Sequence, residues 1–221
     1  MNLFTFNLNV DVSFIDFIDF WSKHYDIEND TKYNRNISVN TFDEDNIIRL
    51  FEWKNQMILS YRKSNSKMTS LENKILSKLK IINEFRENGF VYDNFENEFS
   101  DVSFVWRKFL LHLISPNDYP IYDKNIHLAF EYIVNTIYID QETLYLDYVA
   151  FLKQHKSKLK LKKIDEALIS FGKFMNRKYN KSVDPISDNH KTFVYKSKNL
   201  NNWKSELKKI IFDFNKKYDT Y

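Results

Sequence analysis

The chain has only two glycines and three prolines among its 221 residues. Tight turns between strands depend on glycine, which adopts positive φ freely, and on proline, whose ring fixes φ. A fold with many β-turns would need more of both residues. The scarcity favours long helices, and together with the apolar periodicity it predicts an all-α protein of about eight helices.

Hydrophobic residues make up 43% of the chain and charged residues 29%, which is ordinary for a globular protein that buries a sizeable core. We interpret residues 1–221 as a single helical domain with two candidate lobes. One lobe would combine about residues 1–90 with the C-terminal helices, and the other would cover about residues 91–180. The alternating residues 2–10 predict a short N-terminal strand or an extended arm.

The chain contains no cysteine, so disulfides, thiolate metal sites and cysteine nucleophiles are excluded. No apolar run approaches the length that spans a bilayer, and no secretory leader pattern is present. We therefore expect a soluble, cytoplasmic protein with no membrane partner. The five histidines show no tight spacing with carboxylates, and no phosphate-binding loop motif occurs, so we predict neither a metal site nor a cofactor.

Helix boundaries are marked by local capping signals. Ser13 precedes Asp16, Thr41 and Glu44 form a capping-box pattern, and Thr69 and Glu72 form another. Further helices are predicted at 103–114, 123–138, 140–154, 162–179 and 200–218, and the Thr69 helix is expected to stop at Asn88 and Gly89. Residues 26–40 and 90–102 are polar and irregular, so we predict loops there.

Charge is distributed unevenly along the chain. Residues 1–150 carry 15 Lys or Arg against 23 Asp or Glu, whereas residues 151–221 carry 18 against 7. Such asymmetry suggests a nucleic-acid surface, and DNA is the partner we expect. The alternative is a set of solvated helix faces in a chain rich in lysine. The densest basic cluster consists of Lys156, Lys158, Lys160, Lys162 and Lys163.

The segment from Trp106 to Asp123 is the most informative part of the chain. An apolar helix is followed by a turn that two prolines bound, and Asp123 opens the next helix. A carboxylate at a helix N-terminus is stabilised in its ionised form by free backbone N–H groups and the helix dipole. Asp123 is therefore a candidate general base or cation stabiliser. The alternative is that Asp123 only caps the helix.

The residues Pro120-Ile121-Tyr122-Asp123, after an apolar helix and a short turn, resemble the helix-hairpin-helix DNA glycosylase superfamily, including its 8-oxoguanine branch. The resemblance covers about residues 100–135. It implies that Asp123 is the shared catalytic carboxylate and that a base is flipped out of duplex DNA into a cleft between two helical lobes.

The chain departs from the pattern of that family at the hairpin, at the attacking lysine, and at Asn125, where the family has a histidine two residues after the catalytic carboxylate. The glycines of the family's hairpin, whose backbone amides hold a DNA phosphate, are replaced near Ser100, Asp101 and Val102. The lysine with which bifunctional members attack the sugar is replaced by Phe104. Lys108 lies one helical turn further and is the substitute candidate nucleophile, the alternative being a surface lysine.

Three functions follow as hypotheses. The first is a DNA glycosylase that uses Asp123, or a glycosylase/lyase if Lys108 acts. The alternative is a catalytically inactive DNA-binding or protein-interaction protein, for example in bacterial phage defence, and a plain helical interaction domain is a third reading.

Trp53, Lys54 and Asn55 form a trio that suits base stacking and phosphate contact, or simple helix-end packing. The candidate DNA-binding residues are Lys124, Asn125, His127, His112, Lys158, Lys160 and Lys162.

Overall fold

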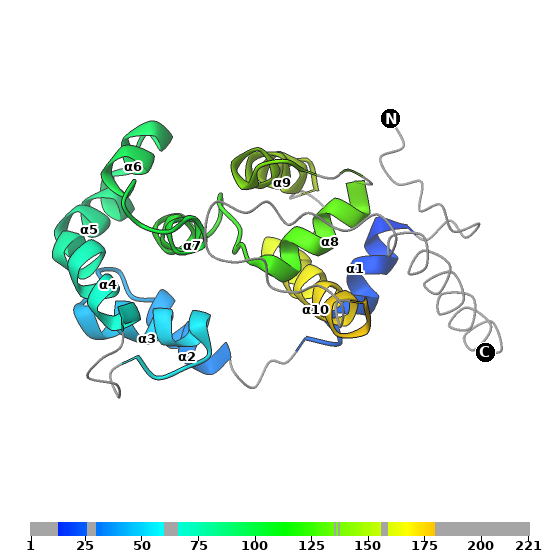
Figure 1. The fold of residues 1–221 in the computed structure, drawn as a ribbon, viewed down its shortest axis with the longest axis horizontal. Coiled ribbons are helices and arrows are strands. Elements are labelled where there is room, and N and C mark those ends of the chain that lie inside the picture. Colours follow the sequence, from blue (N-terminus) through cyan, green and yellow to red (C-terminus); the bar gives the residue numbers. More distant parts are fainter. Residues whose placement is uncertain are drawn as a thin grey trace. The chain divides into compact units, whose positions relative to one another are not determined.

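A computed structural model describes residues 13–25, 30–59, 66–134, 136, 138–155 and 159–179, with side chains through residue 176. The described residues form helices joined by turns and contain no strand (Figure 1), which confirms the prediction of an all-α fold. The chain divides into two compact units. Unit 1 comprises residues 1–24 and 124–221, and unit 2 comprises residues 25–123. The predicted arm at 2–10 and helix at 200–218 lie outside the described residues.

Unit 1 is built from the two distant parts of the chain. Its helices are α1 (Phe14–Ser22), α8 (Lys124–Val134), α9 (Gln141–His155) and α10 (Leu161–Tyr179). Helix α10 packs against both α1 and α8. The Phe171 ring meets Phe17 edge-on at 5.2 Å and lies 5.1 Å from the Trp21 ring. Lys163 on α10 also forms an ion pair with Asp19 on α1. The beginning of the chain therefore completes a core that later residues supply.

The contact between α8 and α10 depends on Gly172. A Cβ atom added at this position would lie 2.0 Å from the backbone oxygen of Asn125, far inside van der Waals contact. The absence of a side chain therefore lets the first turn of α8 touch the backbone of α10. One of the two glycines in the chain thus serves helix packing. The other, Gly89, ends a helix with φ at +77°.

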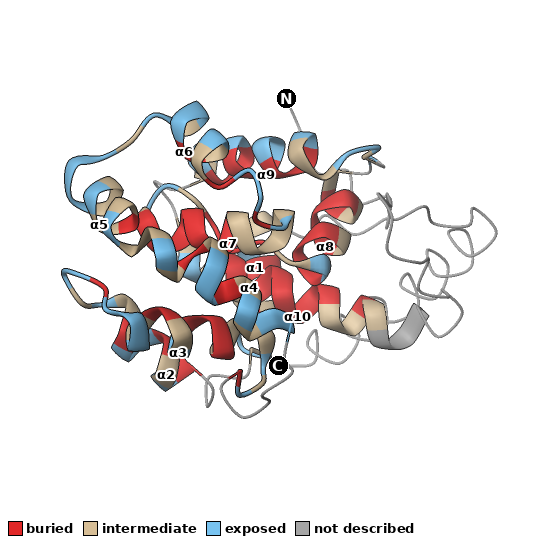
Figure 2. Cartoon of the chain, turned by 60° about the vertical axis from the view of Figure 1, so that its left-hand side comes forward, coloured by how far each residue is buried: buried red, intermediate tan, exposed pale blue. Residues whose placement is uncertain are grey.

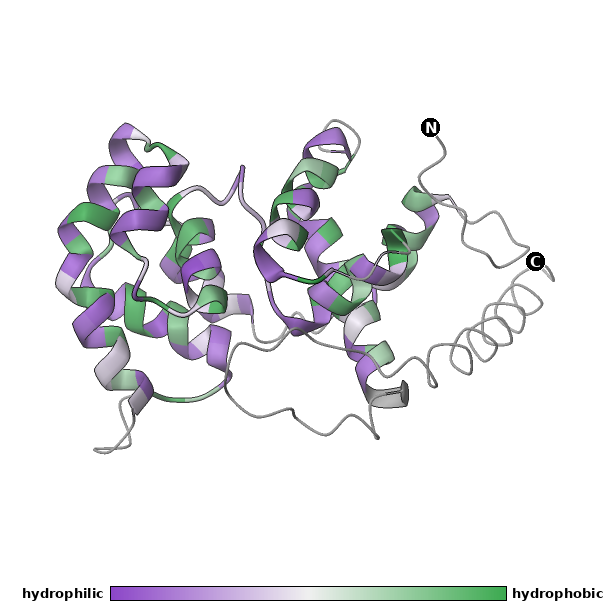
Figure 3. Cartoon of the chain, turned by 45° about the horizontal axis from the view of Figure 1, so that its top comes forward, coloured by the Kyte–Doolittle hydropathy of each residue, from purple (hydrophilic) through white to green (hydrophobic). Residues whose placement is uncertain are grey.

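Unit 2 is one continuous stretch of short helices. They are α2 (Asp30–Ile37), α3 (Glu44–Asn55), α4 (Ser66–Lys74), the 3-10 turn η2 (Leu76–Lys78), α5 (Leu79–Asn88), α6 (Tyr92–Glu98) and α7 (Phe104–Ile114). Every residue from Lys108 to Ile114 on α7 is buried (Figure 2), so α7 is the central helix of this unit. Hydrophobic and hydrophilic residues alternate around the helices of both units (Figure 3), as packing of amphipathic helices requires.

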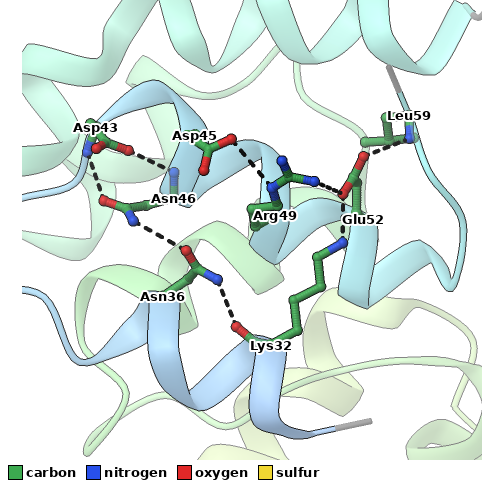
Figure 4. Close-up of polar contacts among 8 residues, drawn as sticks. All are labelled: Lys32, Asn36, Asp43, Asp45, Asn46, Arg49, Glu52 and Leu59. Atoms are coloured by element: carbon green, nitrogen blue, oxygen red, sulfur yellow. Dashed lines mark hydrogen bonds and ion pairs between the residues drawn. The ribbon is translucent and has the colours of Figure 1, made fainter. Parts of the chain in front are cut away.

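A buried carboxylate joins α2, α3 and the residues that follow α3. Glu52 is 2% exposed and accepts hydrogen bonds from Lys32 at 2.6 Å and from the Leu59 backbone at 3.1 Å, as Figure 4 shows. Arg49 lies 3.4 Å from the same carboxylate. Desolvation raises the pKa of Glu52, but these donors outweigh it and leave the pKa below its ordinary value. Glu52 is therefore an ionised structural residue.

A second polar clamp in unit 2 is the guanidinium of Arg86. It donates to the carbonyl oxygens of Leu113, Ile37 and Val39 at 2.8, 2.7 and 2.8 Å. The same group lies 4.0 Å from the centre of the Phe42 ring. One side chain on α5 thus ties the end of α7 to the chain that follows α2.

Several predicted boundaries are confirmed and several are wrong. Ser13 caps α1 by accepting from the Asp16 amide at 3.1 Å, and α7, α9 and α10 lie where they were predicted. The capping box of α3 uses Asp43 and Asn46 instead of Thr41 and Glu44, because Asp43 has the extended backbone and the accepting carboxylate. The predicted helix from Thr69 begins at Ser66 and is broken by the 3-10 turn, and the helix that follows Asp123 ends at Val134 rather than Tyr138.

The loops predicted at 26–40 and 90–102 are wrong, because α2 and α6 lie within them. Tertiary contacts stabilise both short helices despite their polar composition. The carboxylate of Asp30 accepts from Tyr25 at 2.9 Å, and Tyr33 is buried. Phe95 and Phe99 are fully buried along one face of α6. In the part of the chain that the structure describes, no helix combines the length and apolar character needed to cross a bilayer.

Candidate functional site

Asp123 is the last residue of unit 2 and directly precedes α8, the first helix of the returning part of unit 1. The three residues before it, Pro120, Ile121 and Tyr122, are buried, whereas Asp123 is half-buried and Lys124 is exposed. The Tyr122 ring meets the Phe104 ring of α7 edge-on at 5.3 Å. A buried segment thus presents one carboxylate at the surface, at the start of a helix.

His112 of α7 holds the beginning of this segment. Its Nδ1 lies 2.7 Å from the Tyr119 carbonyl oxygen, and its Nε2 lies 2.5 Å from the Tyr33 hydroxyl. A carbonyl oxygen can only accept, so Nδ1 carries the proton and Nε2 accepts from Tyr33. Burial lowers the pKa of His112 to about 4, which keeps the ring neutral near pH 7. Both ring nitrogens of His112 are thus engaged by protein groups. The role of His112 in DNA binding stays a prediction.

Lys54 of α3 holds the end of the same segment. Its ammonium group donates to the Tyr122 carbonyl oxygen at 2.7 Å and lies 5.4 Å from the centre of the Phe109 ring. Its neighbour Trp53 packs its ring 4.6 Å from Tyr33 and 6.0 Å from Phe109. The trio at the end of α3 therefore contributes packing and a backbone anchor. No local sequence signal links Lys54 to a carbonyl that lies far along the chain.

Lys108, the candidate nucleophile, is fully buried on α7. Its ammonium nitrogen lies 2.7 Å from a carboxylate oxygen of Glu96 and 2.6 Å from the Tyr92 hydroxyl. The rings of Tyr92 and Phe104 lie 5.0 and 5.2 Å from the same nitrogen. Glu96 also pairs with Arg107 at 2.8 Å. The lysine is thus enclosed by protein groups that satisfy its charge.

Residues 99–103 form the turn that joins α6 to α7. The Ser100 and Val102 amides donate to the carbonyls of Asn97 and Phe99 at 3.4 and 3.0 Å. Lys74 donates to the Asp101 carbonyl at 2.6 Å. Lys78 also pairs with Glu98 and Asp101, at 3.3 and 3.7 Å. Two amides of this turn therefore donate to carbonyls at the end of α6 and in the turn itself, and the acidic groups Glu98 and Asp101 are paired with nearby lysines.

The other candidates on α8 differ in accessibility. Asn125 is 8% exposed, lies against Gly172 and faces Asn176, whose amide nitrogen is 3.5 Å away. His127 is 3% exposed, with its Nε2 3.3 Å from the carboxylate of Glu131. Within the predicted DNA-binding set on α8, Lys124 alone is exposed. The structure thus leaves Asp123 and Lys124 as the accessible charged pair at the start of α8.

The basic cluster lies around the beginning of α10. Lys158 is outside the described residues, Lys160 is exposed, and the half-exposed Lys162 lies 3.9 Å from Glu166. Ten residues of helix separate Lys162 from Gly172, a distance of about 15 Å along the axis. The described lysines of this cluster are therefore not gathered around Asn125 at the start of α8.

Among the described residues, no three His, Cys, Asp or Glu side chains are placed to hold a metal ion. The carboxylate of Asp118, in the turn before Asp123, accepts a hydrogen bond from the Ser115 hydroxyl at 2.9 Å. No protein-family model matches the chain, and no curated protein or solved structure is significantly similar to it.

Proposed function

We propose that this protein is a DNA glycosylase-like hydrolase in which Asp123 is the catalytic carboxylate. The single observation that carries the proposal is the placement of Asp123. It is half-buried, it directly precedes α8, and it follows a segment that His112 and Lys54 hold at both ends. The order of the elements before it, α6, a short turn and the apolar helix α7, is the order that the resemblance to helix-hairpin-helix glycosylases implies.

The proposed reaction is hydrolysis of an N-glycosidic bond. The bond between the sugar carbon and the base nitrogen breaks, and its electron pair leaves with the base, which then takes up a proton. The Asp123 carboxylate stabilises the positive charge that develops on the sugar and takes a proton from the attacking water, whose oxygen bonds to the sugar carbon. The enclosure of Lys108 by Glu96 and Tyr92 favours this water route over attack by the lysine amine.

The proposal is tested with the Asp123→Asn variant on a panel of duplexes that carry damaged or modified bases. Wild type is expected to release a base from at least one duplex, and the variant is expected to lose this activity. Asp118→Asn is the matched control, because it removes an exposed carboxylate from the preceding turn. Lys108→Met is expected to keep base release. Equal rates for wild type and Asp123→Asn, or no release by wild type, would count against the proposal.

A second candidate function is DNA binding without catalysis, and the α6–α7 turn favours it. The turn has no glycine, and its Ser100 and Val102 amides donate to the nearby carbonyls of Asn97 and Phe99. Binding would then depend on lysines such as Lys124 and Lys160, which are exposed. Affinity for duplex DNA should fall steeply between roughly 50 and 200 mM salt. Salt-dependent binding without base release would favour this second function over the first.

A further inference from the structure

The peptide bond that carries Asp123 is held from one side by Lys54. The Lys54 ammonium donates to the Tyr122 carbonyl oxygen at 2.7 Å, and the Tyr122 side chain is 1% exposed and packs on Phe104. Helix α3 supplies the ammonium and α7 supplies the packing surface. Tyr122 is thus held both through its backbone and through its ring.

The geometry of the peptide group passes this restraint on to Asp123. The Tyr122 carbonyl and the Asp123 nitrogen belong to one planar unit that also includes the Asp123 Cα. A hydrogen bond to the oxygen of that unit therefore restrains the plane from which the Asp123 side chain departs. The position of the carboxylate also depends on the φ angle and the side-chain rotamer of Asp123.

We infer that Lys54 is a positioning residue for Asp123. This inference rests on the proposed function, because it assigns Lys54 a part in the same site. Lys54 acts through the Tyr122 carbonyl and holds the peptide plane in the orientation that catalysis needs. A displacement of about 1 Å at a reacting group can lower a rate by about 100-fold. Loss of the ammonium is therefore expected to slow base release by roughly 10- to 100-fold.

The hydrogen bond between Lys54 and the Tyr122 carbonyl can be followed directly by NMR with paired isotope labels. Carbonyl-¹³C tyrosine combined with ¹⁵N aspartate gives a signal only where tyrosine precedes aspartate, which occurs at Tyr25, Tyr92, Tyr122 and Tyr218. The Tyr122 signal is identified by its disappearance in Asp123→Asn. In Lys54→Met the Tyr122 carbonyl signal is expected to move in the direction of a lost hydrogen bond. The ¹⁵N order parameter of Asp123 is expected to fall in the same variant.

Two further variants separate positioning from general loss of charge. Lys54→Arg keeps a cationic donor and is expected to restore part of the carbonyl shift, the order parameter and the rate. Lys67→Met is the matched control. It removes a lysine whose ammonium lies 3.3 Å from the side chain of Asn55, the residue that follows Lys54. It is expected to leave the four signals and the rate unchanged.

The outcomes distinguish this inference from the proposed function. An unchanged Tyr122 signal and Asp123 order parameter in Lys54→Met would overturn the inference whatever the activity of the protein. An unchanged single-turnover rate in that variant, with wild type active, would overturn it as well. If wild type releases no base, the proposed function fails, while the NMR measurements still decide whether Lys54 positions Asp123.

Discussion

The ammonium nitrogen of Lys108 lies 2.7 Å from a carboxylate oxygen of Glu96, and this ion pair joins α7 to α6 within unit 2. The two partners differ in exposure, because the Lys108 side chain is fully buried whereas that of Glu96 is 20% exposed. Glu96 also has a second cation, Arg107. Removal of the Glu96 carboxylate should therefore destabilise the protein more than removal of the Lys108 ammonium.

Glu96→Gln should destabilise the protein by about 3 kcal/mol, because it leaves a buried ammonium without its anion. Lys108→Met should change the free energy of unfolding by about 1 kcal/mol or less, because the new side chain has similar length and Glu96 keeps Arg107. Urea denaturation measures the free energy of unfolding of both variants. Lys80→Met is the control, because the Lys80 side chain is 88% exposed. A larger loss for Lys108→Met than for Glu96→Gln would contradict the expectation.

Gly172→Ala should destabilise unit 1 by about 1–3 kcal/mol or more, because the new methyl group would overlap the Asn125 backbone. Backbone atoms cannot rotate away as a flexible side chain can, so α8 and α10 must separate. Ser170→Ala is a control on the same helix, since it adds no atom beyond Cβ. Thermal unfolding gives the comparison, and equal midpoints for wild type and Gly172→Ala would show that the contact is looser than described.

Stability should fall as the pH drops from about 6.5 to about 4, because of His112. The folded-state pKa of about 4 lies below the ordinary value, so the unfolded chain binds a proton in this window that the folded chain does not. One such group contributes about 3 kcal/mol across the window and changes nothing above it. His112→Gln should therefore lose stability less steeply in acid than wild type. Identical acid slopes for wild type and His112→Gln would refute the assignment.

Arg86→Met should cost about 2–4 kcal/mol, because three carbonyl oxygens in unit 2 lose a charged donor. Arg86→Lys should recover only part of the loss, since an ammonium cannot copy the planar fork of the guanidinium. Urea denaturation supplies the values. Full stability in Arg86→Met would mean that water replaces the guanidinium at all three carbonyls.

The sequence predicts the helical class and the central helix of unit 2 because these depend on local signals. Scarce glycine and proline, the apolar run after Ser103 and the two prolines of the turn act over a few residues. Helix α6 was missed because its apolar positions are interrupted by Asn, Asp and Glu. The partner of Lys108 was missed with it, since Glu96 lies on α6.

The contacts by which His112 and Lys54 hold the segment before Asp123 could not be predicted either, because they also depend on tertiary packing. His112 is close to Tyr119 in sequence, but its burial and its contact with Tyr33, 79 residues away, arise only from tertiary packing. Lys54 and Tyr122 are separated by 68 residues, so their contact appears only when α3 and α7 are packed. Whether Asp123 itself acts on DNA stays a prediction that base-release measurements decide.

The discontinuity of unit 1 has a consequence for synthesis on the ribosome. Helix α1 emerges early, but its packing partner α10 begins only at Leu161. At roughly 5–20 residues per second, α1 waits on the order of 10 s for α10. During that interval the apolar residues Phe17 and Trp21 lack the Phe171 ring, whereas unit 2 is contiguous and can close first. The nascent chain therefore exposes the apolar face of α1, which still lacks its packing partner α10, while unit 2 is already folded. Chaperones would find a binding site on that apolar face.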